Sequence, residues 1–305
     1  MTTLDTPVGE TRQMVRVTVW GLFLNLFLAA LKFSVGAVVG STALIADGVH
    51  SLSDMSTDFI VLIGIRVSSR PADESHAYGH GKFETIAGFI IGSLLVVAGF
   101  YIAWRAGDSL YMGESIDPGY PVIVVALVSI AAKERICQIT QKVARRVGSV
   151  TLRVNAWHHR SDALSSVIVL IGAIAGTRGW GQADQAAAIV VGMMVASVGL
   201  RSVWRVLREL AEGSVSEEEQ KSIIEAIQSV PGVKSFHKLR TRLVGREIFM
   251  DVHVLVDGQL TVSEGHHICS AVESTVAKSM ARSINAVVHC EPYKGPGETP
   301  QTASG

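Results

Sequence analysis

Two short stretches of this sequence place a histidine four residues before an aspartate, inside segments that are otherwise largely apolar. The first, ADGVHSLSD, contains His50 and Asp54, and the second, HHRSD, contains His158 and Asp162. Residues four apart lie on the same face of an α-helix, so each pair would present an imidazole and a carboxylate together. Two imidazoles and two carboxylates form a tetrahedral ligand set of the kind that Zn²⁺ accepts. The spacing therefore predicts a binding site for a transition metal.

Several transition metals satisfy these ligands, so the pattern leaves the metal open. Zn²⁺, Co²⁺, Fe²⁺ and Cd²⁺ accept imidazole and carboxylate together, whereas Mg²⁺ and Ca²⁺ prefer oxygen ligands alone. For a single pair of this type, a hydrogen bond at a helix contact is an equal alternative. Each histidine, however, lies about nine residues, or about 14 Å, from the expected start of its helix. The two pairs can meet at a similar depth, which favours a shared metal site.

The residues around these pairs allow further interpretations. Asp47 lies one helical turn before His50 and is a further ligand, a hydrogen-bond acceptor that orients the histidine, or a packing partner. We favour the acceptor. Asp58 continues the face of His50 and is expected to line the inner path of the metal. His159 and Arg160 are turned away from the face of His158 and are interpreted as structural or interfacial.

A second group of candidate ligands follows the second apolar segment. The connection RPADESHAYGHGKFE contains Asp73, His76 and His80 within eight residues. Histidine and aspartate side chains in one loop can bind a metal, although solvated loop histidines without a ligand are common. Spacing alone leaves both interpretations open.

A third group lies in the last third of the chain, which contains half of the ten histidines. A packed core does not need so many histidines, so their number favours a regulatory metal site. Strand alternation would place His289 and Glu291 on one face of a sheet. The candidate side chains of this group are His237, His253, His266, His267, His289 and Glu291.

The elements that position these ligands have the composition of membrane spans. Hydrophobic residues make up 48% of the chain and charged residues 18%, and the mean hydropathy is +0.35. A helix needs about 20 largely apolar residues to cross a membrane. The first such run lacks a small-residue cleavage site and others follow it, so it is not a cleaved signal peptide. Six spans are expected, at about 15–40, 41–66, 83–105, 119–140, 149–177 and 184–206.

Six spans place both termini on one side of the membrane, and the basic residues identify that side. The connections expected on the opposite side contain only Arg105 and Arg178. The positive-inside rule therefore predicts that both termini are cytoplasmic. The basic residues of the predicted cytoplasmic side are Arg12, Arg16, Arg66, Arg70, Lys82, Lys142, Arg145, Arg146 and Arg153.

After Arg208 the sequence predicts a small soluble domain. SEEEQ at 216–220 opens an amphipathic helix, two strands follow at 233–243 and 246–257, and a helix at 262–281 precedes a strand at 284–290. This αββαβ order suits a sheet with helices on one face, a ferredoxin-like α+β arrangement. The predicted domains are a cytoplasmic N-terminal segment (1–13), a six-helix transmembrane domain (14–210), a cytoplasmic metal-sensing and dimerisation domain (211–293) and a disordered tail (294–305).

Several functional classes are disfavoured. The formal net charge is zero, so no basic field suggests a nucleic-acid partner. The three cysteines show no CxxC spacing and indicate neither a disulfide framework nor a thiolate zinc site. An intramembrane metalloenzyme would need a general base beside bound water, as in HExxH, and that motif is missing from the sequence. We therefore expect a protein that is not an enzyme and has no prosthetic group.

Taken together, these motifs resemble the cation diffusion facilitators, their zinc-exporting members in particular. The resemblance covers roughly residues 12–292. Besides the six expected spans and the αββαβ domain, it rests on GSTALIADGVHSLSD, RPADESHAYGHGKFE, HHRSD, HKLRTR and VVHCEP.

The resemblance implies a homodimer that works in the lipid bilayer as an antiporter of divalent metal ions and protons. Zn²⁺ is the expected cargo and regulatory ligand, and Fe²⁺, Co²⁺ and Cd²⁺ are alternatives. The implied transport site is His50, Asp54, His158 and Asp162, and the implied loop site is Asp73, His76 and His80. The implied cytoplasmic site is His237, His253, His266, His289 and Glu291, partly at the dimer interface.

The chain departs from the family pattern at three positions. Lys238 stands where relatives with two cytoplasmic metals often carry Asp, and its charge would repel a second cation, so one metal is expected. Glu291 stands where Asp is frequent. His50 replaces the Asp of other relatives, and its softer imidazole favours zinc over manganese.

The mechanism expected from these ligands couples metal to protons, because imidazoles must be deprotonated to bind a metal. Rocking of helices, which rests on the resemblance, would expose the site alternately to each side. A transport-inactive metal sensor or partner subunit is the alternative. The short tails and the lack of an organelle signal favour a cell inner membrane.

Overall fold

A computed structural model describes the backbone of residues 7–68, 73–114, 119–147, 150–245, 247–280 and 282–293. Within these ranges it does not describe the side chains of residues 7–15, 56–68, 146, 147, 150–155, 157 and 158. The predicted tail, 294–305, and the side chain of Asp58 lie outside the described residues. In the predicted N-terminal segment a helix already begins at Pro7, a residue type that suits the first position of a helix.

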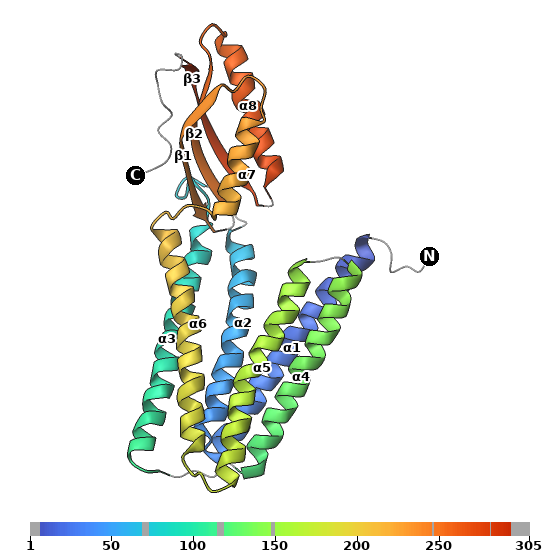
Figure 1. Cartoon of the computed structure of the whole chain (residues 1–305), viewed down its shortest axis with the longest axis vertical. Helices are drawn as coiled ribbons and strands as arrows, with labels where there is room; N and C mark the ends of the chain where they lie inside the picture. The colour runs from blue at the N-terminus through green and yellow to red at the C-terminus, as the bar shows by residue number, and fades with distance from the viewer. Residues whose placement is uncertain are drawn as a thin grey trace. The chain divides into compact units, whose positions relative to one another are not determined.

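Long helices dominate the first two thirds of the described chain (Figure 1). They are α1 (Pro7–Val39), α2 (Thr42–Ser68), α3 (Lys82–Tyr111), α4 (Gly119–Val147), α5 (Val150–Thr177) and α6 (Ala183–Leu210). Four stretches of the described residues are long and apolar enough to cross a membrane: Arg16–Val39, Lys82–Tyr111, His159–Thr177 and Ala183–Leu210. The region is therefore a helical transmembrane region with four candidate spans. The predicted number of six spans stays a prediction.

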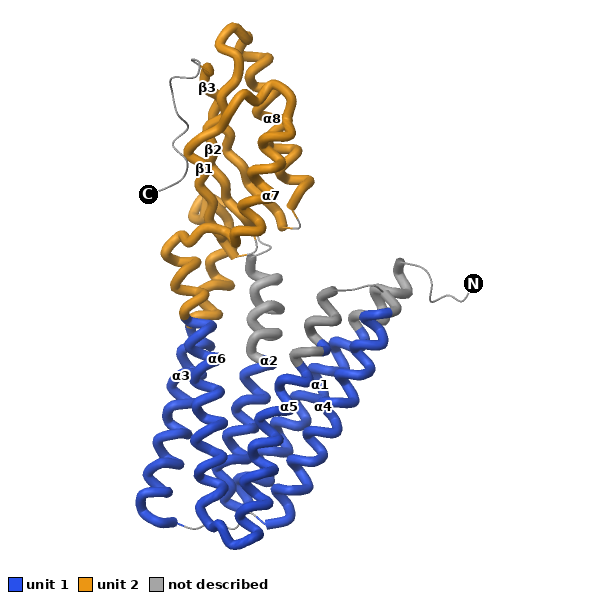
Figure 2. Tube along the Cα trace, viewed as in Figure 1, with its two compact units in different colours: residues 1–61, 90–203 blue, residues 62–89, 204–305 orange. Residues whose placement is uncertain are grey.

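The chain divides into two compact units, which Figure 2 shows in different colours. Unit 1 comprises residues 1–61 and 90–203, and unit 2 comprises residues 62–89 and 204–305. In unit 1, α4 packs against both α1 and α5. Its apolar core is formed by alanine and branched aliphatic side chains, such as Leu44, Val122 and Val169, which are fully buried. The core thus joins α2, which lies in the first segment of the unit, to α4 and α5, which lie in the second.

Helices α3 and α6 approach each other closely through glycine. A methyl group on Gly99 would lie 2.6 Å from the carbonyl oxygen of Gly192, and one on Gly192 would lie 2.9 Å from the carbonyl oxygen of Gly99. No real side chain fits at such distances. Only glycine at both positions allows this backbone contact, the small-residue packing that is common between membrane helices.

Unit 2 contains a small α+β domain. Its elements are α7 (Glu217–Gln228), β1 (Ser235–Val244), β2 (Glu247–Asp257), α8 (Val262–Ser279) and β3 (Ile284–Tyr293), which confirms the predicted αββαβ order. The three strands lie in the order β1-β2-β3, with β1 antiparallel and β3 parallel to β2. Both helices begin with a capping box, Ser216 with Glu219 and Thr261 with Glu264, which satisfies exposed N–H groups of the first turn.

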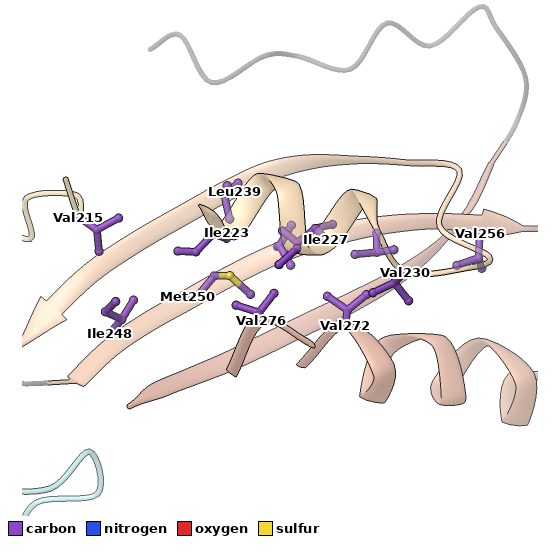
Figure 3. Packing of buried hydrophobic residues seen from close by; sticks show 13 residues of the cluster. Val215, Ile223, Ile227, Val230, Leu239, Ile248, Met250, Val256, Val272 and Val276 are labelled. Atoms are coloured by element: carbon purple, nitrogen blue, oxygen red, sulfur yellow. The ribbon is translucent and has the colours of Figure 1, made fainter. Parts of the chain in front are cut away.

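The core of this domain lies between the sheet and its two helices (Figure 3). Met250, Val252 and Val254 of β2 are almost fully buried there, together with Ile223 of α7 and Val272 of α8. Because successive strand residues point to opposite faces, His253 points to the other face of the sheet. The alternation that builds the core therefore leaves one face of the sheet for polar chemistry.

Candidate metal centres

The first candidate centre lies inside unit 1. His50, Asp54 and Asp162 each offer one ligand atom, and these atoms lie within 4.8 Å of one another. The three side chains are buried, with 6%, 8% and 4% of their surface exposed. The side chain of His158, the fourth predicted ligand, lies outside the described residues. Three of the four predicted ligands therefore converge.

The geometry of α2 and α5 explains this convergence. His50 and His158 each follow the start of their helix by eight residues, about 12 Å along the axis. Asp47, one turn before His50, contacts Ser165 and Ser166, which lie one turn after Asp162. In these contacts a lower residue number in α2 pairs with a higher one in α5, so the two helices run antiparallel. Their polar faces therefore meet at the same level.

The imidazole of His50 is incompletely satisfied within the described residues. His50 Nδ1 is buried and has no hydrogen-bond partner among the described residues. A buried polar atom without a partner costs about 1–3 kcal/mol, so such an atom needs an explanation. An imidazole nitrogen beside two carboxylates has the chemistry of a transition-metal ligand. The described part of the centre therefore fits a divalent metal.

Asp47 lies in a separate, fully satisfied network one turn away. Its carboxylate forms an ion pair with Lys32 of α1 at 2.8 Å, and accepts hydrogen bonds from Ser165 at 2.6 Å and Ser166 at 2.7 Å. Lys32 also donates to Ser51 of α2 and to Ser166. The network joins α1, α2 and α5 without exposure to solvent. Both oxygens of Asp47 are thus engaged away from the centre.

The neighbours of the HHRSD motif face other helices. His159 is buried, and its ring lies where a methyl group on Gly21 of α1 would touch it at 3.2 Å. Arg160 donates two hydrogen bonds to Glu134 of α4, at 2.6 and 3.1 Å. Both side chains therefore join helices in the way that the sequence interpretation expects.

The second candidate centre lies in the connection between α2 and α3. Asp73, His76 and His80 also bring their ligand atoms within 4.8 Å of one another. Asp73 lies 3.5 Å from His76 Nδ1 and 3.3 Å from His80 Nε2. Hydrogen bonds from the Ser75 hydroxyl and from the backbone of His76 lower the pKa of the Asp73 carboxyl to about 2. The carboxylate is therefore ionised, as a metal ligand must be.

This connection packs against the α+β domain within unit 2. The Tyr78 ring meets the Phe249 ring edge to face at 5.8 Å between centroids. A methyl group on Gly81 would lie 2.9 Å from the carbonyl oxygen of Val244. Glu209 of α6 accepts hydrogen bonds from Thr85 and from the backbone of Gly245. The loop ligands are thus held against the β1–β2 hairpin.

The third candidate centre is a row of histidines across the three-stranded sheet. His237 of β1 pairs with His253 of β2, which pairs with His289 of β3. Neighbouring rings lie 5.2 and 4.7 Å apart between centroids. Strand pairing alone brings these three imidazoles together on the face opposite the helices.

Glu291 lies at the centre of this row. Its oxygens are 2.7 Å from His253 Nδ1, 3.0 Å from His237 Nε2 and 3.6 Å from His289 Nε2. The hydrogen bond with His253 is the main cause of a lowered pKa of the Glu291 carboxyl. The ligand atoms of His237, His253 and Glu291 lie within 4.8 Å of one another. This group is half-buried and reachable from solvent.

Other residues predicted for this domain lie elsewhere. His266 and His267 are exposed on α8, which covers the opposite face of the sheet, so the described structure does not bring His266 to the row. Lys238 follows His237 in a β-bulge, with a φ of 51°, and is exposed.

The three cysteines are free, with Cys137 and Cys269 buried and Cys290 exposed.

Both parts of the chain match the sequence pattern of a known protein family. Residues 18–211 match the cation efflux transmembrane domain, and residues 215–293 match the cation efflux protein cytoplasmic domain. The chain belongs to the cation diffusion facilitator family. The members of this family are membrane transporters and not enzymes.

Named relatives of this cation diffusion facilitator come from different hosts, and one of them is named for manganese. Metal tolerance protein C1 of Arabidopsis thaliana is 33% identical over 89% of this chain, which spans 61% of that protein's length. An uncharacterized transporter of Methanocaldococcus jannaschii is 32% identical over 92% of this chain and 99% of its own. Manganese efflux system protein MneP of Bacillus subtilis is 30% identical over 93% and 98%, respectively.

Sequence reasoning on this cation diffusion facilitator missed two buried lysines. Lys32 pairs with Asp47, and Lys133 of α4 lies 3.0 Å from Asp162 and 3.9 Å from Asp54. Each lysine occurs within a predicted span, where a charged side chain is costly and marks a functional site. A charged residue within a predicted span was therefore enough to mark both lysines as candidate functional residues, although it does not reveal their partners.

Proposed function

We propose that this protein exports a divalent transition metal, zinc first among the candidates, in exchange for protons. The observation that carries the proposal is the buried group of His50, Asp54 and Asp162 between α2 and α5. The matching position of His158 on α5 would complete a set of two imidazoles and two carboxylates. A buried ligand set between membrane helices suits a transported ion.

The choice of zinc rests on ligand softness. Imidazole is a softer ligand than carboxylate and suits zinc, iron and cobalt, whereas manganese accepts sites built from oxygen. The relative named as a manganese efflux protein makes Mn²⁺ a competing cargo for this chain. A His50→Asp variant would replace a softer imidazole nitrogen by a harder carboxylate oxygen. We expect it to raise the ratio of Mn²⁺ flux to Zn²⁺ flux relative to the native chain.

Proton exchange follows from the same ligands. A metal binds only deprotonated imidazole and carboxylate, so binding on one side releases protons and protonation on the other side expels the metal. An imidazole titrates near pH 6.5 when nothing perturbs it, close to physiological pH. The mechanism needs no residue besides the ligands to carry the proton.

We further propose a homodimer in a cell inner membrane, with six spans and both termini in the cytoplasm. The His237, His253, His289 and Glu291 row would bind a regulatory metal, with His266 contributed from elsewhere in the dimer. The loop ligands Asp73, His76 and His80 would bind another. Metal on the cytoplasmic row would favour one arrangement of the two copies and so bias transport.

Metal flux in proteoliposomes tests the proposal. The chain is reconstituted, a pH gradient is imposed, and uptake of Zn²⁺, Fe²⁺, Co²⁺, Cd²⁺ and Mn²⁺ is measured for the native chain and for Asp162→Ala. Glu134→Gln is the matched control, because it removes a half-exposed carboxylate of α4 that pairs with Arg160 and lies outside the ligand set. Zinc flux that needs the gradient, vanishes in Asp162→Ala and persists in Glu134→Gln supports the antiporter. Flux without a gradient would indicate a facilitator.

Flux of no metal by a folded dimer would favour the alternative, a transport-inactive metal sensor or partner subunit. The regulatory role has its own test. The dependence of flux on cytoplasmic metal is measured in a His253→Ala, His289→Ala double variant. We expect activation to need a higher metal concentration. An unchanged dependence would remove the sensing role from the sheet.

A further inference from the structure

Lys133 occupies the place in unit 1 where a cation is needed. It extends from α4, its side chain is 1% exposed, and its Nζ donates a hydrogen bond of 3.0 Å to Asp162 Oδ2. The same nitrogen lies 3.9 Å from Asp54 Oδ2. Two of the candidate metal ligands therefore share one ammonium group.

The contrast with Lys32 shows that this ammonium is loosely held. An ammonium group has three donors. Lys32 uses them on Asp47, Ser51 and Ser166, at 2.8, 2.9 and 3.0 Å. Within the described part of the chain, Lys133 makes one hydrogen bond and one longer ion pair. Lys32 is thus fixed in place, whereas the ammonium of Lys133 has N–H donors that form no hydrogen bond among the described residues.

A metal and this ammonium group compete for the same carboxylate oxygens, Oδ2 of Asp162 and Oδ2 of Asp54. A zinc ion bound to a carboxylate oxygen lies about 2.0–2.2 Å from it. The ammonium lies only 3.0 Å from the same oxygen of Asp162. In a buried site such close like charges repel strongly, because little solvent screens them. Metal binding must therefore move the ammonium away.

The helix itself offers a place for the displaced group. Long helical side chains lean toward the N-terminus of their helix, over the residue four positions earlier. That residue is Ser129, which is fully buried and whose hydroxyl has no hydrogen-bond partner among the described residues. Its oxygen can accept a hydrogen bond from Lys133 once the carboxylates are taken.

We propose that Lys133 is a tethered counter-cation, which balances one of the two negative charges of Asp54 and Asp162 without metal and which the arriving metal displaces toward Ser129. The inference rests on the proposed function, since it assigns the metal to that centre. Lys133 acts as a built-in competitor. It lowers the affinity of the centre for metal and so speeds release, which a transporter needs as much as binding.

Equilibrium zinc binding to the full chain tests this role. Asp73→Ala and His253→Ala are present in every sample, so that the loop and the sheet bind little zinc. Removing the charge with Lys133→Gln or Lys133→Met should tighten zinc binding at least about 10-fold. Lys133→Arg should weaken it at least about 10-fold, because a guanidinium grips two carboxylates more firmly than an ammonium does. Opposite shifts are the signature of competition.

Three controls complete the design. Lys142→Gln makes the same chemical change at an exposed position of α4 and should leave zinc binding unchanged. Ser129→Ala should weaken zinc binding about threefold, since the displaced ammonium loses a hydrogen bond. In an Asp162→Asn background, the gain from Lys133→Gln should shrink, because the pair no longer competes for the same carboxylate.

The outcomes separate the possible roles of Lys133. A folded Lys133→Gln or Lys133→Met chain that binds zinc as weakly as its parent, or more weakly, would show that the lysine is only structural. If neither variant folds, Lys133→Arg decides, and unchanged zinc binding there overturns the proposal. The binding shifts do not need transport. Shifts without flux would refute the proposed function alone, and flux without shifts would refute this inference alone.

Discussion

The buried centre of unit 1 and the histidine row of unit 2 use the same side chains in opposite settings. His50, Asp54 and Asp162 are at most 8% exposed, and a lysine from a third helix balances one of the two negative charges of the aspartates. In the sheet, Glu291 lies between His253 and His237, and the group is half-buried. Imidazole and carboxylate meet in both places, but only one is closed to solvent.

The difference teaches how the setting assigns a role to the ligands. Charges in a buried centre must be balanced, by lysine, protons or metal, so exchange of one cation for another is unavoidable. A half-exposed group is balanced partly by water and can gain or lose a metal without a compensating ion. The buried centre therefore suits ion exchange, and the row suits sensing.

Replacing one buried carboxylate is expected to have the largest effect. Asp54→Asn removes a ligand and its charge, so gradient-driven metal flux should fall by at least about 100-fold. Proteoliposome flux measures it, with Glu134→Gln as control. Flux above a tenth of the native value would mean that Asp54 is not a ligand, and the comparison between the two centres would fail.

Breaking the satisfied ion pair next to the centre should mainly affect stability. Asp47→Asn leaves Lys32 buried without a counter-ion, which costs about 3–5 kcal/mol. Thermal unfolding in detergent should show a clear loss. The double change Lys32→Met, Asp47→Leu should cost much less than the single change, since no charge is then left unpaired. Equal losses in both variants would argue that shape, not charge, holds α1, α2 and α5 together.

Removing the carboxylate of the sheet should shift regulation and leave transport intact. Glu291→Gln should raise the cytoplasmic metal concentration for half-maximal activation about 10-fold, while flux at saturating metal changes little. Concentration series of flux separate the two quantities. A loss of maximal flux as large as that of Asp54→Asn would erase the functional distinction between the centres.

The pH response of Glu291 sharpens the same comparison. Its lowered pKa means that the ion pairs with histidine stabilise the domain above the ordinary carboxyl pKa and are lost as pH falls through the lowered value. His253→Ala removes the main cause and should raise the pKa of Glu291 toward its usual range. NMR of labelled glutamate in the full chain measures it. An unmoved pKa would point to another cause.

The smallest expected effect concerns the loop carboxylate. Asp73 has a pKa of about 2, so it stays ionised as pH falls until that value is approached. Ser75→Ala removes the hydrogen bond that contributes most and should raise this pKa toward about 3.9, the usual value for aspartate. NMR titration of labelled aspartate detects the change. A pKa that stays near 2 would assign the shift to the backbone of His76.

Much of the fold could be predicted from local pattern. Alternation in β2 and the capping residues Ser216 and Thr261 give the order and approximate bounds of the α+β domain. The four-residue spacing of His50 and Asp54 identifies one face of α2. The pattern could not give the pairing of His237 with His253 and of His253 with His289, because strand register depends on contacts between distant segments.

The sequence by itself determined which helix and strand faces carry the candidate ligands, because a helical face repeats about every four residues and a strand face every two. It therefore identified Asp54, Asp162 and Glu291 as candidates. Only the tertiary structure decided that Lys133 approaches Asp162 and that Lys32 and two serines engage Asp47. These contacts join residues up to 119 positions apart. No local periodicity encodes such pairs, which arise when helices pack and each buried charge must find a partner.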